Sequence, residues 1–335
     1  GADRVSGFAV RGFSTRTHLL GDGRLLVREL TLGALSPQDH APLSFFLVHQ
    51  VYRLLGDAEM TFRVVSVGSG LGFACLASLI SHELAQNPVT RWEMTVLLIV
   101  QGYALLFFGY VETYGVLFAV SALYVYVAIR FVKGTAPLIL PAGVLGVAIC
   151  CHLAAISLVP SLLVLAIVRR ERDPLGVFGS IALMPALAIG LLYLLDYPFS
   201  GRGGESLVSR HTLSIGLPTG DTAAYTIFAA AHFTDVLNAL ALASPAFVVG
   251  LPLFTRPAGR NAFDLWFLTL CLPPILMIWM INPEIGAFRD WDVLAFPGLF
   301  LTVALGRWLA VLSEETASGG WILLVGVSLL HLGPW

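Results

Sequence analysis

The acidic residue Asp22 lies between Gly21 and Gly23, in a stretch too polar to cross a membrane. Flanking glycines let the backbone turn sharply and leave the carboxylate unshielded. Such a carboxylate can take a proton from an acceptor hydroxyl or amine. It can also bind a divalent cation, Mg²⁺ or Mn²⁺, that neutralises a phosphate leaving group. Gly-Asp-Gly is also a common turn, so the local sequence by itself fits a structural role too.

A second acid, Glu112, stands between Tyr110 and Tyr114. Aromatic rings suit the face of a sugar, and a carboxylate between them can bind a hydroxyl or an amine. Tyrosines at the ends of apolar runs also form the aromatic belt of membrane proteins. The sequence therefore offers a substrate-binding group or an interfacial belt at these positions.

The densest later cluster is Arg289-Asp290-Trp291-Asp292. Arg289 could hold a lipid phosphate through two parallel hydrogen bonds, and Trp291 offers a stacking face. An ion pair between Arg289 and Asp290 that closes a loop is the alternative. Asp-x-Asp resembles the metal-nucleotide motif of soluble glycosyltransferases, but those enzymes have another fold.

Two weaker groups complete the candidates. His232 and Asp235 are three residues apart, so on a helix they would share a flank that lines a lipid-carrier groove or bonds a neighbouring helix. Arg202 and Arg210 lie in the glycine-rich stretch 197–222, which could cover a phosphate-bearing donor as a lid or be a solvated connection.

Composition sets the class of protein that must position these residues. The chain has 335 residues, of which 57% are hydrophobic and 12% charged, and its mean hydropathy is +0.83. Soluble domains carry about 25% charged residues. We therefore predict an all-α, polytopic integral membrane protein. The net charge of −2, without a basic run, gives no indication of nucleic-acid binding.

The apolar runs predict the spans. Residues 42–55 are too few to cross a bilayer and predict an interfacial helix. The predicted spans are 62–81, 94–111, 115–132, a broken pair at 136–150 and 153–168, then 176–195, 239–255, 263–282, 293–312 and 320–335. We expect a single transmembrane domain over 1–335, with a first outer loop and interfacial helix in 1–60 and a multi-span bundle in 61–335. The first residue is not Met and the last run is apolar, so we expect further segments at both ends.

Basic loops predict the orientation, because Lys and Arg near span ends stay in the cytoplasm. The markers are Arg91, Arg130 with Lys133, Arg169 to Arg172, and Arg256 with Arg260. With these inside, the segments 16–40, 110–114, 197–222 and 282–292 all lie outside. One lysine against 18 arginines suggests a bacterial genome, and hence a bacterial inner membrane.

A resemblance adds to this interpretation. The stretch His40-Ala-Pro-Leu-Ser-Phe-Phe-Leu-Val-His49 is followed by Arg53-Leu-Leu-Gly-Asp57 and then by Arg63. It resembles the segment after the first outer loop of C-type (GT-C) membrane glycosyltransferases, in the branch with protein O-mannosyltransferases and lipid A aminoarabinose transferases. The resemblance covers about residues 16–80 and implies a GT-C-like helical bundle with outer loops and interfacial helices.

In that family the first outer loop carries an essential Asp, often beside another acid. Asp22 would inherit the role. No acid adjoins Asp22 here, since Glu29 is seven residues on and Asp39 seventeen. This departure leaves the metal requirement open and makes Asp39 a second candidate for the catalytic place.

The sequence thus predicts a glycosyltransferase with a polyprenyl-phosphate-linked sugar donor, and with membrane lipids around it. The acceptor would be a glycan, lipid or protein on the extracytoplasmic side. Asp22 or Asp39 would deprotonate the acceptor, and Arg289 with Arg202 or Arg210 would stabilise the departing phosphate. The alternatives are a transporter or flippase of lipid-linked or anionic substrates, and a non-catalytic membrane subunit.

Overall fold

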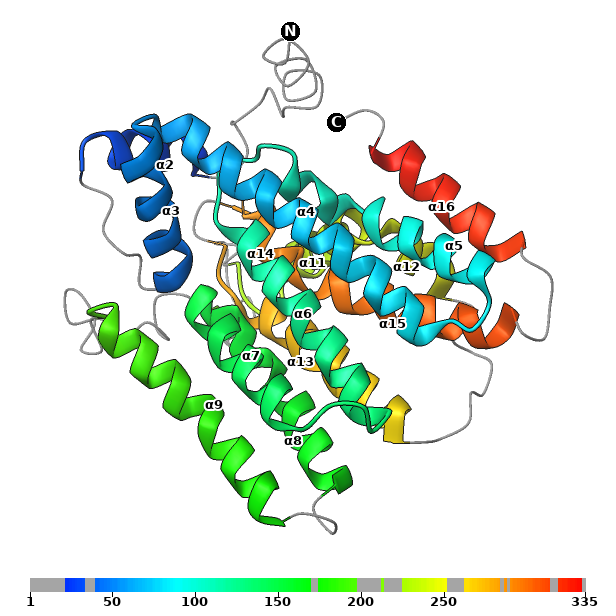
Figure 1. Cartoon of the computed structure of the whole chain (residues 1–335). Helices are drawn as coiled ribbons and strands as arrows, with labels where there is room; N and C mark the ends of the chain where they lie inside the picture. Colours follow the sequence, from blue (N-terminus) through cyan, green and yellow to red (C-terminus); the bar gives the residue numbers. More distant parts are fainter. Residues whose placement is uncertain are drawn as a thin grey trace, which may run out of the picture.

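The computed structural model describes residues 22–33, 40–169, 174–197, 212–213, 225–251, 262–283, 286–287, 290–313 and 319–332. Within these ranges the regular structure is helical, apart from an isolated antiparallel bridge between Thr212 and Ile281. The helices, shown in Figure 1, are α2 (Gly23–Thr31), α3 (Pro42–Leu55), α4 (Ala58–Leu84), α5 (Pro88–Ile99), η1 (Gly102–Phe107), α6 (Tyr114–Val132), α7 (Ile139–Cys151), η2 (Leu153–Leu158), α8 (Val159–Arg169), α9 (Pro174–Leu194), α11 (Ala230–Ala243), α12 (Pro245–Gly250), α13 (Ala262–Met280), α14 (Trp291–Leu294), α15 (Phe296–Ser313) and α16 (Gly319–Leu332).

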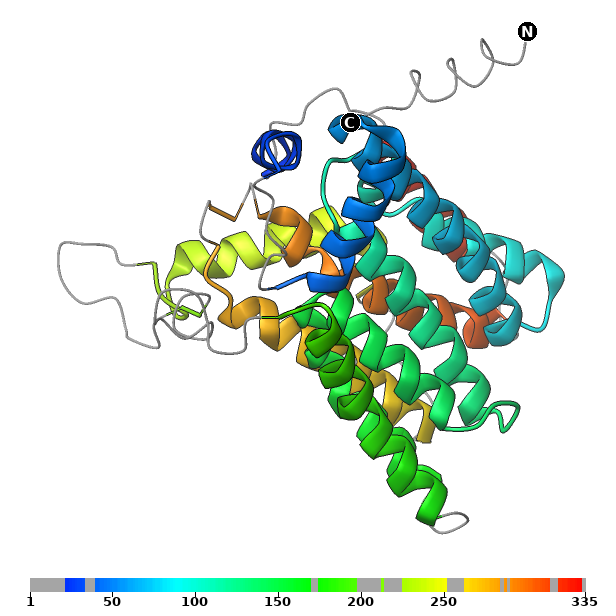
Figure 2. The ribbon, with the colours of Figure 1, turned by 60° about the vertical axis from the view of Figure 1, so that its left-hand side comes forward.

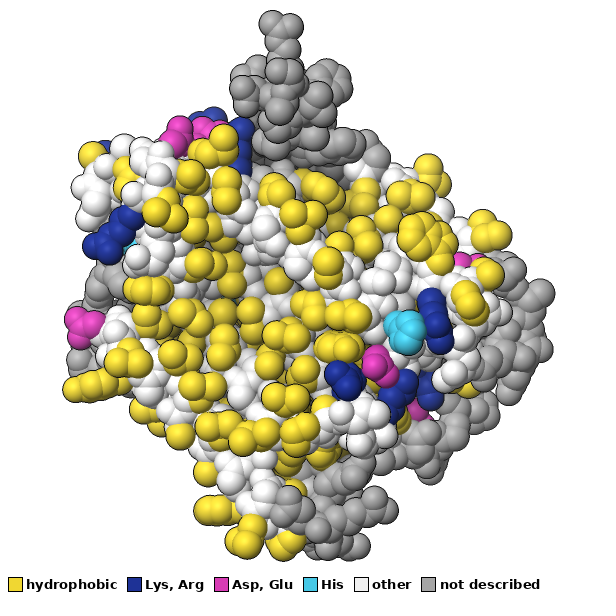
Figure 3. Space-filling view, in the orientation of Figure 1, with side chains coloured by type: hydrophobic (Ala, Val, Ile, Leu, Met, Phe, Trp, Pro, Cys, Tyr) yellow, Lys and Arg dark blue, Asp and Glu magenta, His cyan; other side chains and the backbone are white. Residues whose placement is uncertain are grey.

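Five helices of the described part are long and apolar enough to cross a membrane. They are Ala58–Leu84, Tyr114–Val132, Pro174–Leu194, Phe263–Met280 and Trp291–Leu312. Each coincides with a predicted span, and the prediction of an all-α polytopic membrane protein is confirmed. Apolar side chains of α4, such as Leu71 and Leu79, are exposed. Figure 3 shows a broad hydrophobic surface on this side of the molecule.

The longest helix, α4, connects the two ends of the bundle. Asp57 caps it, because its carboxylate accepts a hydrogen bond of 2.9 Å from the amide of Met60. Its 27 residues extend about 40 Å at 1.5 Å per residue. It packs against α5 and α6, and its first turns pack against α2 and α3. Helix α4 therefore joins the N-terminal helices to the core of the bundle.

The predicted span 94–111 is not one helix. Helix α5 ends at Ile99, and the 3₁₀ helix η1 follows. At the break, the buried side chain of Gln101 donates to the carbonyl of Leu97 and to the hydroxyl of Ser328. A Cβ atom on Gly102 would lie 1.6 Å from the carbonyl oxygen of Leu242, so only glycine permits this approach.

The predicted span 239–255 is also interrupted. Helix α11 ends at Ala243, and α12 begins at Pro245 with Ser244 between them. Proline disfavours helical backbone at the preceding residue, so the break follows from the sequence. At the break, the Ser244 hydroxyl is hydrogen-bonded to the hydroxyl of Thr302 in α15 at 2.8 Å. Two short helices therefore replace one span.

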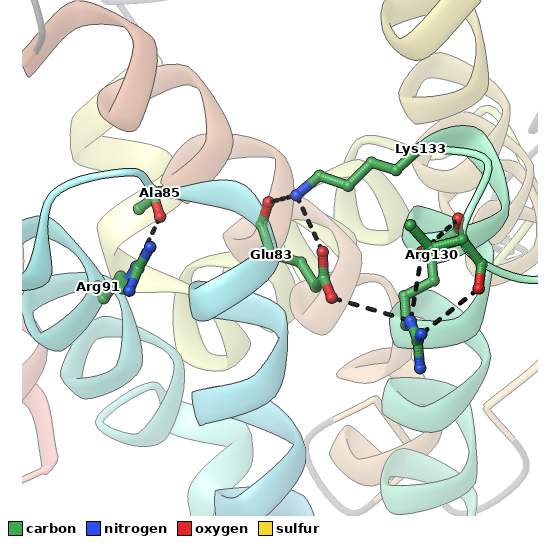
Figure 4. A network of polar contacts seen from close by, with 6 residues as sticks. Glu83, Ala85, Arg91, Arg130 and Lys133 are labelled. Atoms are coloured by element: carbon green, nitrogen blue, oxygen red, sulfur yellow. Dashed lines mark hydrogen bonds and ion pairs between the residues drawn. The ribbon is translucent and has the colours of Figure 1, made fainter.

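A basic cluster marks one end of the bundle (Figure 4). Lys133, just after α6, donates to the Glu83 carboxylate at 2.9 Å and to the Glu83 carbonyl, while Arg130 lies 3.9 Å from the same carboxylate. Nearby, Arg91 of α5 donates to the carbonyl of Ala85 at 2.8 Å. These are three of the residues predicted to share one side, and the structure does bring them together. Arg170 to Arg172, Arg256 and Arg260 lie outside the described residues.

Helix α6 runs from this basic cluster to Tyr114 at the other end, a distance of about 24 Å over 16 residues. The N-terminal helices lie at that second end (Figure 1). Figure 2 shows α11 running beside the segment that contains α14, and these two helices are in contact. Seven of the candidate residues meet at this end of the bundle.

Candidate functional site

Helix α2 carries Asp22 to the second end of the bundle. Leu26 and Leu30 form its buried face and pack in one cluster with Phe62 and Val111. A Cβ atom on Gly23 would lie 3.0 Å from the carbonyl oxygen of Val111, so glycine allows α2 to approach the backbone at Val111 closely. The sequence Gly21-Asp22-Gly23 allowed a sharp turn, whereas in the structure Gly23 is the first residue of helix α2.

Asp22 precedes that helix and is joined to Glu112. The Asp22 amide donates to Oε1 of Glu112 at 3.2 Å, and the Asp22 side chain makes no capping hydrogen bond. Asp22 is exposed, whereas Glu112 is only 9% exposed. The backbone of Asp22 is thus anchored while its carboxylate faces outward.

Burial raises the pKa of Glu112 well above its ordinary value, and the negative charges of Asp292 and Asp22 raise it further. Hydrogen bonds from the backbone of Asp22 and Thr113 act in the opposite direction but are smaller. Three carboxylates from α2, the η1–α6 connection and α14 therefore form one electrostatic group, the carboxylate cluster. Glu112 keeps its proton to higher pH than an exposed glutamate does.

Tyr110 ties Trp291 and Asp292 into this cluster. The indole Nε1 of Trp291 donates to the Tyr110 hydroxyl at 3.2 Å, and that hydroxyl donates to Oδ2 of Asp292 at 3.3 Å. The amide of Val293 donates to Oδ1 of Asp292 at 2.9 Å. The rings of Tyr110 and Trp291 pack edge to face with centroids 5.6 Å apart. Burial and the charges of Asp292 and Glu112 raise the pKa of Tyr110, so its hydroxyl stays neutral and able to donate.

Tyr114 and two histidines extend the cluster toward α3. The partly buried Tyr114 lies close enough to Asp292, Glu112 and Asp290 to interact with them electrostatically. Its ring packs on His152 at 4.9 Å between centroids, and the ring of His152 lies 5.1 Å from that of His40. The carbonyl of His40 accepts a bond of 2.8 Å from the amide of Leu153, which joins the segment before α3 to η2.

His152 was not among the candidate site residues of the sequence. The structure places it against Tyr114, because α7 ends at Cys151 and the amide of Ala154 donates to its Nδ1 at 3.0 Å. The neutral ring therefore carries its proton on Nε2. The signal in the sequence was the break between two apolar runs at His152, which lies on the predicted outer side.

His232 and Asp235 form a separate group. They bond each other through the hydroxyl of Tyr225, and His232 also bonds the carbonyl of Trp279. This arrangement favours the structural alternative for the pair over a lining of a lipid groove. Neither Tyr225 nor Trp279 stood out in the sequence, since nothing in the spacing connects either to His232.

Of the predicted site residues, Asp22, Tyr110, Glu112, Tyr114, Asp290, Trp291 and Asp292 come together at one end. Of the other six, His232 and Asp235 form the separate group above, and Asp39, Arg202, Arg210 and Arg289 lie outside the described residues. Among the residues that are described, no three His, Cys, Asp or Glu side chains are grouped so as to hold a metal ion. The described cluster can bind hydroxyl and amine groups and accept a proton at Asp22.

No protein-family profile and no curated protein sequence matches this chain. Among solved structures, it is similar to ArnT from Cupriavidus metallidurans, crystallised with bound undecaprenyl phosphate, with a TM-score of 0.59. This chain shares the fold of ArnT. The two sequences are 15% identical, and the match covers 95% of this chain and 59% of ArnT.

ArnT is an aminoarabinose transferase with the GT-C fold, so the fold implied by the sequence resemblance is confirmed. The chain spans less than two thirds of ArnT, and the likeness concerns the fold. What ArnT binds therefore bears on this chain as a proposal only.

Proposed function

We propose that this protein is a glycosyltransferase that moves a sugar from a polyprenyl-phosphate donor to an acceptor. The observation that carries the proposal is the meeting of Asp22, Glu112 and Asp292 at one end of an ArnT-like fold. The partner seen with ArnT, undecaprenyl phosphate, supports a lipid-phosphate donor. An isoprenoid carrier lies in the bilayer, which accounts for a transferase built from membrane helices.

In the proposed reaction the acceptor attacks the anomeric carbon directly. A bond forms between the acceptor oxygen or nitrogen and this carbon, and the bond from the carbon to the phosphate oxygen breaks. The acceptor proton passes to the carboxylate of Asp22, and polyprenyl phosphate leaves with the electron pair. Asp39 is the alternative base, and Arg289 with Arg202 or Arg210 would stabilise the leaving phosphate.

The remaining described residues would hold the reactants. The raised pKa of Glu112 extends its protonated form to higher pH, and this form can donate a hydrogen bond to a sugar or acceptor oxygen. The Tyr110 and Trp291 rings, packed edge to face, fix the position of the Asp292 carboxylate. Precise placement of this kind accounts for much of the rate in reactions between two bound substrates.

We further propose that the carboxylate cluster faces the extracytoplasmic side of a bacterial inner membrane. The basic cluster of Arg91, Arg130 and Lys133 at the other end supports this orientation, because such residues remain in the cytoplasm. A cysteine introduced at exposed Asp22 and one at exposed Arg53 should both react with an impermeant thiol reagent added outside intact cells. If both cysteines react only after the cells are permeabilised, the carboxylate cluster faces the cytoplasm and the proposed orientation is wrong.

The central experiment measures sugar transfer in liposomes. The purified protein is given polyprenyl phosphates that carry labelled hexoses or pentoses, with a membrane extract as the source of acceptor. We expect Asp22→Asn to lower turnover by about 10²- to 10⁴-fold, the usual contribution of a general base. Asp39→Asn is tested alongside, since it is the second candidate.

Asp57→Asn is the matched control. Asp57 is another exposed acid, and Asn also caps a helix, so this variant should keep both fold and activity. Unchanged turnover in the variants of both Asp22 and Asp39 would refute the proposed mechanism. Movement of the labelled lipid between leaflets without turnover would instead support a flippase.

A further inference from the structure

A chain of three side chains lies beside α14 but outside the carboxylate cluster. The Tyr225 hydroxyl donates to Oδ2 of Asp235 at 2.8 Å. Nδ1 of His232 lies 3.1 Å from the same hydroxyl, and Nε2 of His232 lies 2.8 Å from the carbonyl oxygen of Trp279. His232 is only 1% exposed, while Tyr225 and Asp235 are partly exposed. No part of the proposed reaction uses these residues.

The directions of these hydrogen bonds determine the protons on His232. The carbonyl of Trp279 can only accept, so Nε2 carries a proton. With Asp235 as a carboxylate, the Tyr225 hydroxyl gives its one proton to Asp235 and therefore accepts from a protonated Nδ1 of His232. Burial and the bond to Asp235 raise the pKa of Tyr225, which keeps its hydroxyl neutral. Opposite an ionised Asp235, a neutral His232 would set two lone pairs against each other at one of its two contacts.

We propose that His232 is a buried imidazolium, paired with the Asp235 carboxylate through Tyr225, and that it positions α14 for the proposed reaction. A buried charge is costly unless it is paired and hydrogen-bonded. Here every ring proton has an acceptor, and the carboxylate balances the charge one hydroxyl away. His232 is a positioning residue, since it acts through α14.

The connection from His232 to α14 runs through a small apolar cluster. Val236, one turn beyond His232, packs with Ile278, which adjoins Trp279. Both pack against Leu294 of α14, and Val293 joins the same cluster. The ring of His232 also packs edge to face on Trp279, with centroids 5.5 Å apart. The bond from His232 to Trp279 thus fixes α11 to the end of α13, and α11 is itself in contact with α14.

The charge of His232 can be read directly by solid-state NMR. The chain has eight histidines, so the ring nitrogens of His232 are identified by comparing ¹⁵N-histidine spectra of the wild type and His232→Gln. At neutral pH both ring nitrogens should be protonated. In Tyr225→Phe, which removes the acceptor of Nδ1, one of them should lose its proton. A wild-type ring with an unprotonated nitrogen overturns the charge assignment, and so does a Tyr225→Phe ring that keeps both protons.

A second arm tests the positioning role and rests on the proposed function. Asp235→Asn removes the balancing charge, and we expect it to lower kcat by about 10-fold with little change in the donor KM. Asp235→Glu should restore most of this loss. Thr234→Ala is the control, because Thr234 is exposed and its hydroxyl donates to the carbonyl of Ala230, one turn back in α11. An unchanged kcat in Asp235→Asn overturns the positioning role. If the wild type transfers no sugar, the proposed function fails, while the NMR result still decides the charge of His232.

Discussion

Tyr110→Phe removes one oxygen atom from the centre of the candidate site. Two buried groups then lose a partner, since Trp291 Nε1 loses its acceptor and Asp292 loses a donor. A buried group left unsatisfied costs about 1–3 kcal/mol in soluble proteins. In membrane bundles such bonds contribute about 0.6 kcal/mol on average and up to about 1.7. Two bonds therefore give a loss of roughly 1–3 kcal/mol.

At about 2–4 °C per kcal/mol, this loss predicts a fall in Tm of roughly 2–12 °C. The aromatic packing of residue 110 on Trp291 remains, so the fold should persist while the Asp292 carboxylate loses a fixed position. We expect kcat for sugar transfer to fall by about 10-fold or more. Thermal unfolding in detergent and turnover in liposomes measure the two effects on the same preparation.

Tyr124→Phe is the matched control for this variant. Tyr124 is fully buried and its hydroxyl bonds Ser161 at 2.6 Å, but it lies ten residues from Tyr114 along α6, about 15 Å from the site. It should lower Tm by a similar amount and leave kcat unchanged within about twofold. Equal effects of the two variants on kcat would refute the positioning of Asp292 by Tyr110. So would a Tyr110→Phe protein with wild-type turnover.

Three further predictions follow from other contacts. Because the pKa of Glu112 is raised above its ordinary 4.5, its protonated form stabilises the fold at low pH, and this stability is lost as pH rises through the raised pKa. The Tm of the wild type relative to Glu112→Gln should therefore fall as pH increases from about 4 to 8, and a constant difference would contradict the shift. Gly102→Ala sets a Cβ atom against the backbone of Leu242 and should sharply lower Tm and the yield of monodisperse protein, whereas Gly72→Ala, which meets no atom within 4 Å, should not. Glu83→Gln breaks a partly exposed ion pair with two basic residues near the end of α6, so it should cost less than about 1 kcal/mol and leave turnover unchanged.

The convergence of the candidate residues could be predicted from the sequence, because the number of spans between two segments decides whether they lie on the same side of the membrane. The basic residues near span ends assign Asp22, Glu112 and Asp292 to one side, whatever the details of packing. The structure brings these three acids together on elements far apart in the chain. The sequence could not give the order of contacts within the cluster, such as the bond from the Asp22 amide to Glu112, because backbone donors carry no residue type.

The interruptions of the spans show a different limit. The break after Ser244 was readable, since Pro245 follows it. The break at Gln101 and Gly102 was not, because its cause is the close approach of Leu242, which comes from α11. Likewise, Tyr225 and His232 are joined by tertiary contact, and no helical spacing connects them.

The backbone of Asp22 has a structural role, whereas its carboxylate is the group proposed to react. The residue is fixed by its amide, which bonds Glu112, and by Gly23, which lets α2 approach Val111. Neither contact uses the Asp22 carboxylate. A base that must take a proton and release it again works best when the fold does not depend on its charge. Conversely, Glu112 and Asp292 are buried in the contacts that organise this end of the bundle, so loss of either acid alters both position and charge. A substitution of the outward Asp22 carboxylate therefore tests the reaction while the contacts that hold α2 in place remain.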